Sequence, residues 1–355
     1  MAEERLQKRP LVSIILATFN EVDHVQKCMT SLLGQEASEF DLEILAVDGI
    51  STDGTREYLE RTATADPRVR VVLNEKRRAP FAFNLGLSQA RGEYVCIFGS
   101  HTVYQRDYIS ICLRELNRRG AVLCGGRVIT RPSANTVQAR LVASTLGHAF
   151  GSSPKSFRTQ REGFSDTVNY PVLRKQALIE TGGFEESLLR NQDNDIDQKL
   201  CARGYKLFHT WKTSCIYYPK AKVKDLLLYG YHNGFWNGLT LQRNADSMSS
   251  RHFIPFVFVV SVLLSVLLGL VGAFAHLPNS VVGFISLGVI VGMHLVVGSA
   301  AAAQIGFHER FPGAIWLPFV FLAFHLSYGI GTLWALLSRA KPPDSTDQNL
   351  ATAGV

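Results

Sequence analysis

The stretch LEILAVDGISTDGT, residues 42–55, joins an apolar run that ends in Asp48 to an acidic turn that contains Asp53. A short apolar run bounded by Gly and Asp is typical of a buried strand, and residues 55–62 after it have a helical pattern. Further strand-like runs are LVSIILA (11–17), VRVVL (69–73), YVCIF (94–98) and AVLCGG (121–126), and further helical patterns cover residues 21–33, 81–90 and 106–118. Strands that alternate with helices in this way predict an α/β fold with a mostly parallel sheet covered on both faces.

Polar residues follow three of these strands where the strands end. They are Thr18, Asn20, Glu21, Asp48, Ser100 and His101. In open α/β sheets ligands bind beyond the carboxyl ends of the strands, so we expect these residues to line a ligand site. Asp48 can accept a hydrogen bond from a nucleotide base or a ribose. Asp53 is explained equally well as the cap of the following helix.

A second acidic cluster lies in LLRNQDNDIDQKL, residues 188–200. Clustered carboxylates raise one another's pKa, which suits Asp193 to act as a general base. The same residues also fit an exposed helix N-terminus, where the helix dipole favours negative charge. The residues alone leave both interpretations open.

The C-terminal part of the chain is apolar over a long distance. Between residues 253 and 337 the only full charges are Glu309 and Arg310. Three apolar segments, residues 253–275, 280–303 and 311–337, approach or exceed the ~20 residues needed to cross a bilayer. Residues 223–243 have apolar and aromatic residues on a helical stripe (Leu228, Tyr231, Phe235 and Leu239, beside Trp236) and basic flanks, which is typical of a helix in the headgroup plane. A helix packed on the soluble domain is the alternative.

These patterns predict four regions: a catalytic domain over residues 1–220, an interfacial region over 221–250, about three membrane spans over 251–338 and a polar tail over 339–355. We expect residues 1–220 to fold and bind nucleotide without the rest. MAEERLQKRP at the start is charged, and the net charge of +7 suits a basic cytoplasmic face against anionic lipid. We therefore expect a multi-pass protein of the inner membrane with a cytoplasmic catalytic domain. Nucleic acid is not an expected partner, because no basic stripe carries interleaved aromatic residues.

Several motifs together resemble one enzyme family. They are VSIILATFNE, SLLGQ, LEILAVDGISTDGTREYL, FAFNLGLSQARGEYV, HTVYQRDYI, EGFSDTVNYPVLRKQAL, GGFEESLLRNQDNDIDQKL and FHLSYGIGTLWALL. This set resembles the inverting glycosyltransferases of family 2, and more narrowly the membrane-anchored bacterial enzymes of succinoglycan-type exopolysaccharide assembly. The resemblance covers residues 11–337.

The resemblance implies a GT-A fold, a nucleotide-sugar donor (a UDP-sugar is favoured), a divalent metal ion and a polyprenyl-diphosphate-linked saccharide as acceptor. Asp48 matches the nucleotide-binding aspartate of the family and Asp193 its general base. Asp195 matches the acidic residue that follows, so Asp193 and Asp195 are the expected catalytic residues. Arg190 and Gln192 are expected to bind the substrate.

One motif departs from the family. Its metal-binding sequence after the fourth strand is D-x-D or D-A-H, and this chain has Gly99-Ser100-His101. His101 is therefore the expected metal ligand, with Mn²⁺ preferred to Mg²⁺ because manganese tolerates an imidazole. Gly99→Asp is expected to supply the absent ligand. His101 could instead donate a hydrogen bond to the diphosphate with no metal present.

Two other functions remain open from the sequence. One is transfer of a sugar directly onto polyprenyl phosphate. The other is a catalytically silent homologue that binds nucleotide or lipid and holds other assembly enzymes together.

Overall fold

A computed structural model describes residues 9–188, 190–243, 250–276 and 279–338. Contacts among these residues form two compact units: residues up to 129 with 161–217, and residues 130–160 with those from 218 onward. The predicted boundary at residue 220 thus lies near the third change of unit, between residues 217 and 218. The structure adds that residues 130–160 pack with the C-terminal helices, although they lie between two parts of the first unit in the sequence.

The first unit is built on one mixed sheet with the strand order β3-β2-β1-β4-β8-β6-β9-β5, and β7 pairs with β9. The strands are β1 (Leu11–Thr18), β2 (Asp41–Asp48), β3 (Val69–Leu73), β4 (Tyr94–Gly99), β5 (Thr102–Tyr104), β6 (Leu123–Thr130), β7 (Gly163–Ser165), β8 (Val172–Arg174) and β9 (Leu207–Tyr217). The pairs among β1, β2, β3 and β4 are parallel, whereas β8 pairs antiparallel with β4 and β6. The predicted α/β class is confirmed.

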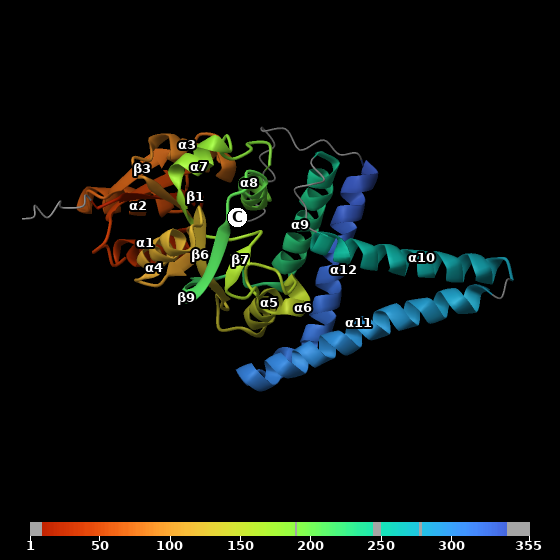
Figure 1. Ribbon diagram of the computed structural model, residues 1–355. Coiled ribbons are helices and arrows are strands. Elements are labelled where there is room, and N and C mark those ends of the chain that lie inside the picture. The colour runs from red at the N-terminus through yellow and green to blue at the C-terminus, as the bar shows by residue number, and fades with distance from the viewer. Residues whose placement is uncertain (1–8, 189, 244–249, 277–278, 339–355) are drawn as a thin grey trace, which may run out of the picture. The chain divides into compact units, whose positions relative to one another are not determined.

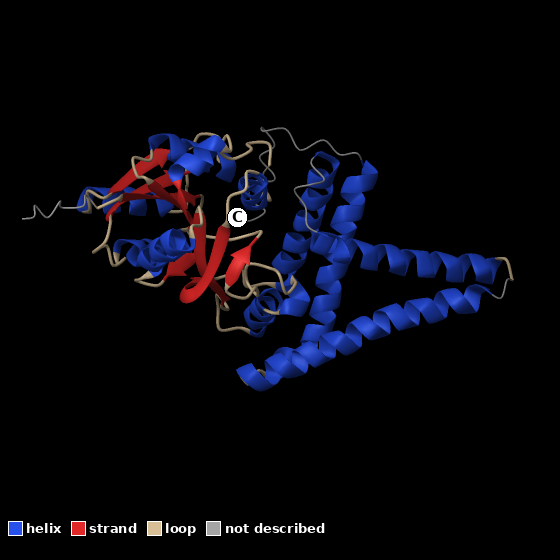
Figure 2. Ribbon diagram, viewed as in Figure 1, coloured by secondary structure: helices blue, strands red, loops and turns tan. Residues whose placement is uncertain are grey.

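Helices cover both faces of this sheet, as Figure 2 shows. They are α1 (Val22–Leu33), α2 (Thr55–Ala65), α3 (Ala79–Gln89), α4 (Tyr108–Arg119), α7 (Lys175–Glu180) and α8 (Gln192–Ala202). One core cluster brings Ile15 and Leu45 of the sheet against Phe83 of α3, Leu178 of α7 and Leu200 of α8. Burial on both faces explains why the strand runs are continuously apolar.

Two segments differ from what their sequence pattern predicts. Residues 171–183 have a helical pattern that stops at two glycines, but they begin with strand β8 before the short helix α7, because Val172 pairs with both β4 and β6. The runs KLFHTW (206–211) and CIYYP (215–219) predict two short strands, but one continuous strand, β9, covers Leu207–Tyr217. Its polar middle stays extended because Thr213 and Ser214 bond to side chains that precede α4: the Thr213 hydroxyl donates to Asp107 Oδ1 at 2.7 Å, and the Ser214 N–H donates to Gln105 Oε1 at 2.8 Å.

The second unit is helical. It contains α5 (Val137–Gly147), α6 (Ala149–Ser152), α9 (Val223–Arg243), α10 (Ile254–Phe274), α11 (Asn279–Glu309) and α12 (Leu317–Ser338), with short 3₁₀ turns η2 (Ser250–Phe253) and η3 (Pro312–Trp316). A core cluster joins Leu141 and Val142 of α5 to Leu226 of α9, Ile305 of α11 and Phe321 of α12. The apolar face of α5 is therefore covered by the C-terminal helices.

Helix α9 packs along α12 through glycines spaced by four residues, Gly230, Gly234 and Gly238. A Cβ added at Gly234 would lie 1.9 Å from the backbone oxygen of Tyr328 on α12. Small residues at this spacing let two helix backbones approach closely. On the helical stripe that the sequence indicates, Leu228 is exposed while Leu239 and the neighbouring Trp236 are buried, so α9 is half of a helix pair within its unit.

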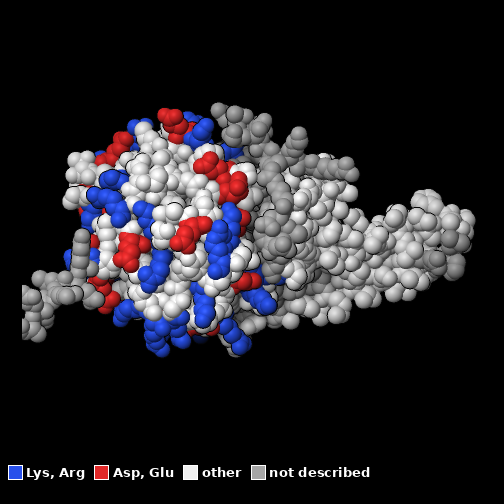
Figure 3. All heavy atoms as spheres, turned by 45° about the horizontal axis from the view of Figure 1, so that its top comes forward, with Lys and Arg blue, Asp and Glu red and all other residues white. Residues whose placement is uncertain are grey.

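Within the described residues three helical segments are long and apolar enough to cross a membrane: Ser250–Phe274, Ser280–Glu309 and Pro312–Ser338. They coincide closely with the predicted spans. On the face in Figure 3, basic and acidic residues are interspersed over the first unit, whereas the apolar helices show no charge.

Candidate active site

The strand register brings the expected loops to one edge of the sheet. Thr18 at the end of β1 pairs with Asp48 at the end of β2, and Ala17 pairs with Gly99 at the end of β4. The loops that follow these strands therefore start side by side. This is the edge where ligands of parallel sheets bind.

The loops after β1 and β2 are joined by hydrogen bonds. The N–H of Asn20 donates to Ser51 Oγ at 2.9 Å, and the N–H of Thr52 donates to Asn20 Oδ1 at 2.9 Å. The N–H of Glu21 donates to Thr55 Oγ1 at 2.8 Å. Asn20 has a φ of 54°, a left-handed conformation that Asn tolerates better than most residues. The two loops thus form one rigid, polar rim.

Asp48 is fully buried under this rim. Its Oδ1 accepts the Ser51 hydroxyl at 2.6 Å and its Oδ2 accepts the Ser51 N–H at 2.9 Å. The carboxylate therefore orders the turn that carries Ser51. Direct contact of Asp48 with a nucleotide stays a prediction.

Asp53, in the same rim, joins the start of α1 to the start of α2. Its Oδ2 accepts the N–H of Val22 at the start of α1, and its Oδ1 accepts the N–H and hydroxyl of Thr55. Partial burial acts to raise the pKa of Asp53, but the hydrogen bonds from Thr55 and Val22 outweigh it and hold that pKa below its usual range. The N-cap residue of α2 is Gly54 and not Asp53, but the Asp53 carboxylate accepts the N–H of Thr55, the first residue of that helix.

His101 follows β4 and meets Glu21 from the loop after β1. Nδ1 of His101 lies 3.5 Å from Oε1 of Glu21, and the imidazole packs edge-on against Tyr217. His101 is 9% exposed and Ser100 is 2% exposed. The structure thus adds Glu21 to the surroundings of the expected metal ligand.

These side chains do not by themselves form a metal site. Among the described residues no three His, Cys, Asp or Glu side chains converge so that they could hold a metal ion. At this edge Glu21 and His101 offer two ligand groups, and Gly99 offers none. A hard divalent cation takes about six ligands, so a resident ion does not fit the protein groups alone.

The second acidic cluster opens α8, as the sequence predicts. Asn191 has a φ of 64° before the helix begins, and Asp193 lies in its first turn. Oδ2 of Asp193 accepts a hydrogen bond from Asn169 Nδ2 at 3.1 Å, and Oδ1 accepts from the Asn194 N–H at 2.9 Å. The half-buried Asp193 is therefore held in one orientation and keeps unused lone pairs for a proton.

Other members of the cluster have structural partners. Asp195 is ion-paired with Lys199 at 2.6 Å. Asp197 is buried, and its Oδ2 accepts the N–H of Val168 at 2.8 Å. Burial raises the pKa of Asp197 well above its usual range, against the opposing effect of that hydrogen bond. Of the expected substrate contacts here, Gln192 opens α8 and Arg190 precedes it.

Residues 167–170 contact both the start of α8 and the end of β4. Asn169 holds Asp193, and the ring of Tyr170 lies against Gly99: a Cβ added at Gly99 would be 3.1 Å from Cε1 of Tyr170. No local pattern in the sequence singles out either residue. The structure thus brings the expected residues of β1, β2, β4 and α8 into one unit, and Asn169 and Tyr170 are the members that sequence reasoning missed.

Several polar atoms around this connection lack partners. Thr102 Oγ1, Asn169 Oδ1 and Gln192 Oε1 are buried and accept or donate no hydrogen bond within the described structure. Because buried polar atoms are nearly always satisfied, these three atoms are candidate contacts for a ligand.

Comparison with known proteins agrees with this geometry. Residues 13–180 match the family model described as glycosyl transferase family 2. The chain is 28% identical over 317 residues to the succinoglycan biosynthesis protein ExoA of Rhizobium meliloti, covering 85% of this chain and 93% of the relative. It is 27% identical over 267 residues to a dolichyl N-acetyl-alpha-D-glucosaminyl phosphate 3-beta-D-2,3-diacetamido-2,3-dideoxy-beta-D-glucuronosyltransferase of Methanococcus voltae, covering 73% of this chain and 82% of the relative.

Among solved structures, a mannosyltransferase of Pyrobaculum calidifontis in complex with GDP-Man and Mn²⁺ is similar in fold. Its TM-score is 0.55 at 18% sequence identity, with 94% of this chain and 89% of that chain covered. The sheet, its carboxyl edge and the matched motifs agree on one assignment: this chain carries a glycosyl transferase family 2 domain with a GT-A-like fold, and it is homologous to the succinoglycan biosynthesis protein ExoA.

Proposed function

We propose that this protein is an inverting, membrane-anchored glycosyltransferase of exopolysaccharide or cell-surface glycan synthesis. It transfers a sugar from a nucleotide-sugar donor to a polyprenyl-diphosphate-linked saccharide. The observation that carries the proposal is the orientation of Asp193 by Asn169 and the Asn194 N–H, in the same unit as the polar rim after β1 and β2.

Each part of the site has a task in this reaction. The polar rim binds the nucleoside of the donor. Asp193 takes the proton of the acceptor hydroxyl while the hydroxyl oxygen attacks the anomeric carbon. The bond from that carbon to the diphosphate breaks on the opposite side, so the configuration inverts in one displacement without a covalent enzyme intermediate. A general base contributes about 10²–10⁴-fold to such a step.

The relatives support the substrate classes. The Methanococcus voltae relative is named for a dolichyl phosphate-linked sugar as acceptor, and the Pyrobaculum calidifontis structure contains GDP-Man. A UDP-sugar remains the donor that we favour from the resemblance. A divalent cation would bring positive charge to the leaving diphosphate, and His101 and Glu21, which lie 3.5 Å apart, are the side chains that would ligate it.

The test is a transfer assay with purified full-length protein. UDP- and GDP-sugars are offered with polyprenyl-diphosphate-linked saccharides and, separately, with polyprenyl phosphate. We expect transfer to the diphosphate-linked saccharide, with a product whose anomeric configuration by NMR is opposite to that of the donor. Retained configuration would contradict the single displacement, transfer to polyprenyl phosphate alone would favour the one-sugar carrier, and no transfer from any donor would favour the silent homologue.

We also propose that the three apolar helices place the protein in the inner membrane with the first unit in the cytoplasm. The supply of nucleotide sugars there and the basic residues before α9 support this orientation. Protease protection in right-side-out and inverted vesicles tests it: the first unit should be cleaved only in inverted vesicles.

A further inference from the structure

Helices α10 and α11 form a hairpin whose outside is apolar. A Cβ added at Gly283 would lie 2.2 Å from the backbone nitrogen of Gly269, so the two backbones approach closely. Only 17% and 11% of their most apolar stretches are buried, and Figure 1 shows the hairpin end leading away from α12. Helix α10 has 21 residues and thus spans about 30 Å, the thickness of the hydrocarbon core. This hairpin is long enough to cross a bilayer and return.

Helix α12 is instead packed within the second unit. The buried share of its most apolar stretch is 39%, more than twice that of either hairpin helix. Phe321 and Phe324 belong to the core cluster that also contains Leu141 of α5. Burial in the protein therefore accounts for much of the apolar character of α12 without a surrounding bilayer.

Helix α9 runs beside α12 in the same direction. A Cβ added at Gly230 would lie 2.9 Å from the Phe324 ring, and one added at Gly238 would lie 2.7 Å from Cβ of Ala335. Among the described helices α9 is not one of those apolar enough to cross a membrane. Polar residues recur along it: Asp225, His232, Asn233, Asn237 and Gln242. Because the two helices are joined along their length, an α12 that crossed the bilayer would carry α9 into it as well.

The start of α10 meets α12 near the middle of α12. A Cβ added at Gly329 would lie 2.2 Å from the backbone oxygen of Pro255 and 2.5 Å from Cγ2 of Val259. Arg251 lies one turn before Pro255 in the chain. If α12 crossed the bilayer, Arg251 would therefore lie near its centre, where a charged side chain is unfavourable. An α12 along the membrane surface leaves Arg251 at the level of the headgroups.

Helix α5 indicates on which side of the membrane α11 ends. Residues 130–160 are joined at both ends to the first unit, and α5 has 11 residues, too few to cross a bilayer. The backbone oxygen of Glu309 accepts from Arg140 Nη2 at 3.2 Å, and its Oε2 accepts the Ser144 hydroxyl at 3.3 Å. The end of α11 and the start of α12 thus lie on the side of the first unit.

We propose that the chain crosses the membrane twice, through α10 and α11, and that α12 lies beside α9 along the membrane surface on the side of the first unit. The partner of the outer face of α12 is the boundary between lipid headgroups and acyl chains. That face is exposed and apolar, with a tryptophan near each end: Ile315, Trp316, Phe319, Ile330, Trp334 and Leu337. The composition of the chain predicts about three spans, and this arrangement removes one of them. The inference rests on the proposed membrane location and not on the proposed reaction.

The number of crossings is tested on the full-length protein with one epitope at each end of the chain. Protease is added to right-side-out and to inverted vesicles, with detergent-opened vesicles as the control for cleavage. We expect both epitopes to be lost in the same vesicle preparation. Loss of one epitope in each preparation would show an odd number of crossings and overturn the inference. Loss of both only in right-side-out vesicles would reverse the proposed orientation but leave two crossings intact.

The depth of α12 is tested with single cysteines at the exposed positions Phe319, Ile330 and Leu337, with Leu264 of α10 as the control. Five of the six native cysteines are buried, so Cys201→Ser removes the partly exposed one. Each cysteine carries a fluorophore in liposomes that contain lipids with a spin label near the headgroup or deep in the acyl chain. We expect stronger quenching by the shallow label at all three α12 positions and by the deep label at Leu264. Deeper quenching at Ile330 than at the other two α12 positions would overturn the inference, and so would the absence of quenching on α12.

Discussion

At the scale of single residues, the site depends on which carboxylates are committed to structure and which are available for chemistry. Asp193 and Asp197 are one helical turn apart on α8. Asp197 is buried and accepts a backbone N–H, whereas Asp193 is half-buried and accepts a hydrogen bond from the side-chain amide of Asn169. The same residue type therefore serves two purposes in one short helix.

We expect Asp193→Asn to lower turnover by about 10²–10⁴-fold with little change in nucleotide affinity, because the amide cannot accept the acceptor proton. Asp197→Asn is the matched control: its amide oxygen can still accept the Val168 N–H, so transfer should persist. Steady-state kinetics of both variants checks this. More than about a tenth of wild-type turnover in Asp193→Asn would remove that residue from the role of base.

Variants of Asp48 and Ser51 distinguish a direct contact of Asp48 with the nucleotide from a role of Asp48 in ordering the turn. If Asp48 contacts the nucleotide, Asp48→Ala should weaken GDP or UDP binding by about ten- to a hundredfold, as for loss of a charged hydrogen bond. Ser51→Ala removes only the hydroxyl that joins Asp48 to the Asn20 N–H, and we expect a few-fold effect. Equal losses in both variants by calorimetry would assign Asp48 to the turn alone.

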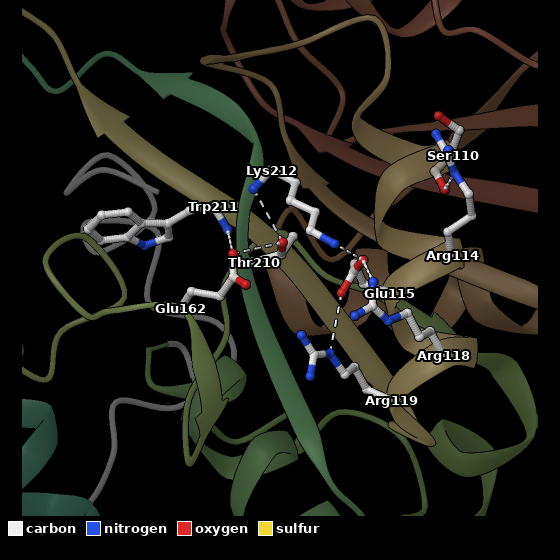
Figure 4. Close-up of polar contacts among 9 residues, drawn as sticks. All are labelled: Ser110, Arg114, Glu115, Arg118, Arg119, Glu162, Thr210, Trp211 and Lys212. Carbon is white, nitrogen blue, oxygen red and sulfur yellow. Dashed lines mark hydrogen bonds and ion pairs between the residues drawn. The ribbon is translucent and has the colours of Figure 1, made fainter.

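At the scale of elements, two contacts illustrate how pieces of each unit are joined. In the first unit, Glu115 of α4 meets Lys212 of β9 and the two arginines Arg118 and Arg119 of its own helix (Figure 4). Burial acts to raise the pKa of Glu115, but these cations outweigh it and hold that pKa below its usual range.

Glu115→Gln should lower the free energy of unfolding near pH 7 by about 1.5 kcal/mol, the lower end for a charged hydrogen bond, because the Lys212 side chain is 41% exposed. A lowered folded-state pKa adds stability above the unfolded pKa of about 4.3 and loses it as pH falls through the folded value. The wild type should thus lose stability more steeply than the variant below about pH 4.3 in urea titrations. Glu39→Gln, from an exposed pair with Arg114 at 3.7 Å, is the control and should change little.

In the second unit, the glycine contacts of α9 with α12 should be intolerant of any side chain. We expect Gly234→Ala to destabilise the full-length protein in detergent by about 1–3 kcal/mol or more, because its Cβ would meet the backbone of α12 and not a movable side chain. Gly288→Ala on α11 is the control, since nothing lies within 4 Å of its added Cβ. Equal thermal stability of the two variants would contradict close packing of α9 on α12.

At the scale of the whole molecule, a helical segment of the second unit lies in the sequence between two parts of the first unit. Residues 130–160 leave after β6, pack α5 and α6 with the C-terminal helices, and lead back to β7. Leu141, Val142 and Leu146 of α5 are covered in this way. A cut at residue 220 therefore does not separate the two hydrophobic cores, because α5 lies before the cut but belongs to the core of the second unit.

This arrangement revises the expectation that residues 1–220 fold and bind nucleotide alone. Truncation at residue 220 would expose the apolar face of α5, and we expect that fragment to aggregate. A fragment that also replaces residues 130–160 by a short Gly/Ser linker should be monomeric and bind GDP or UDP. Size-exclusion chromatography with calorimetry compares the two; a monomeric, nucleotide-binding 1–220 fragment would contradict the dependence of α5 on the C-terminal helices.

The sequence by itself was sufficient for the parallel strands, the acidic start of α8 and the apolar spans, because apolar runs, turn residues and charge gaps are local properties. It was misleading at β8, where only two of three residues are buried and no period is clear, so that pairing with β4 and β6 decides the conformation. Only the tertiary structure placed Asn169 against Asp193, Tyr170 against Gly99 and α5 among the C-terminal helices. Those placements are contacts between segments distant in the sequence, and packing and backbone pairing of the whole fold determine them.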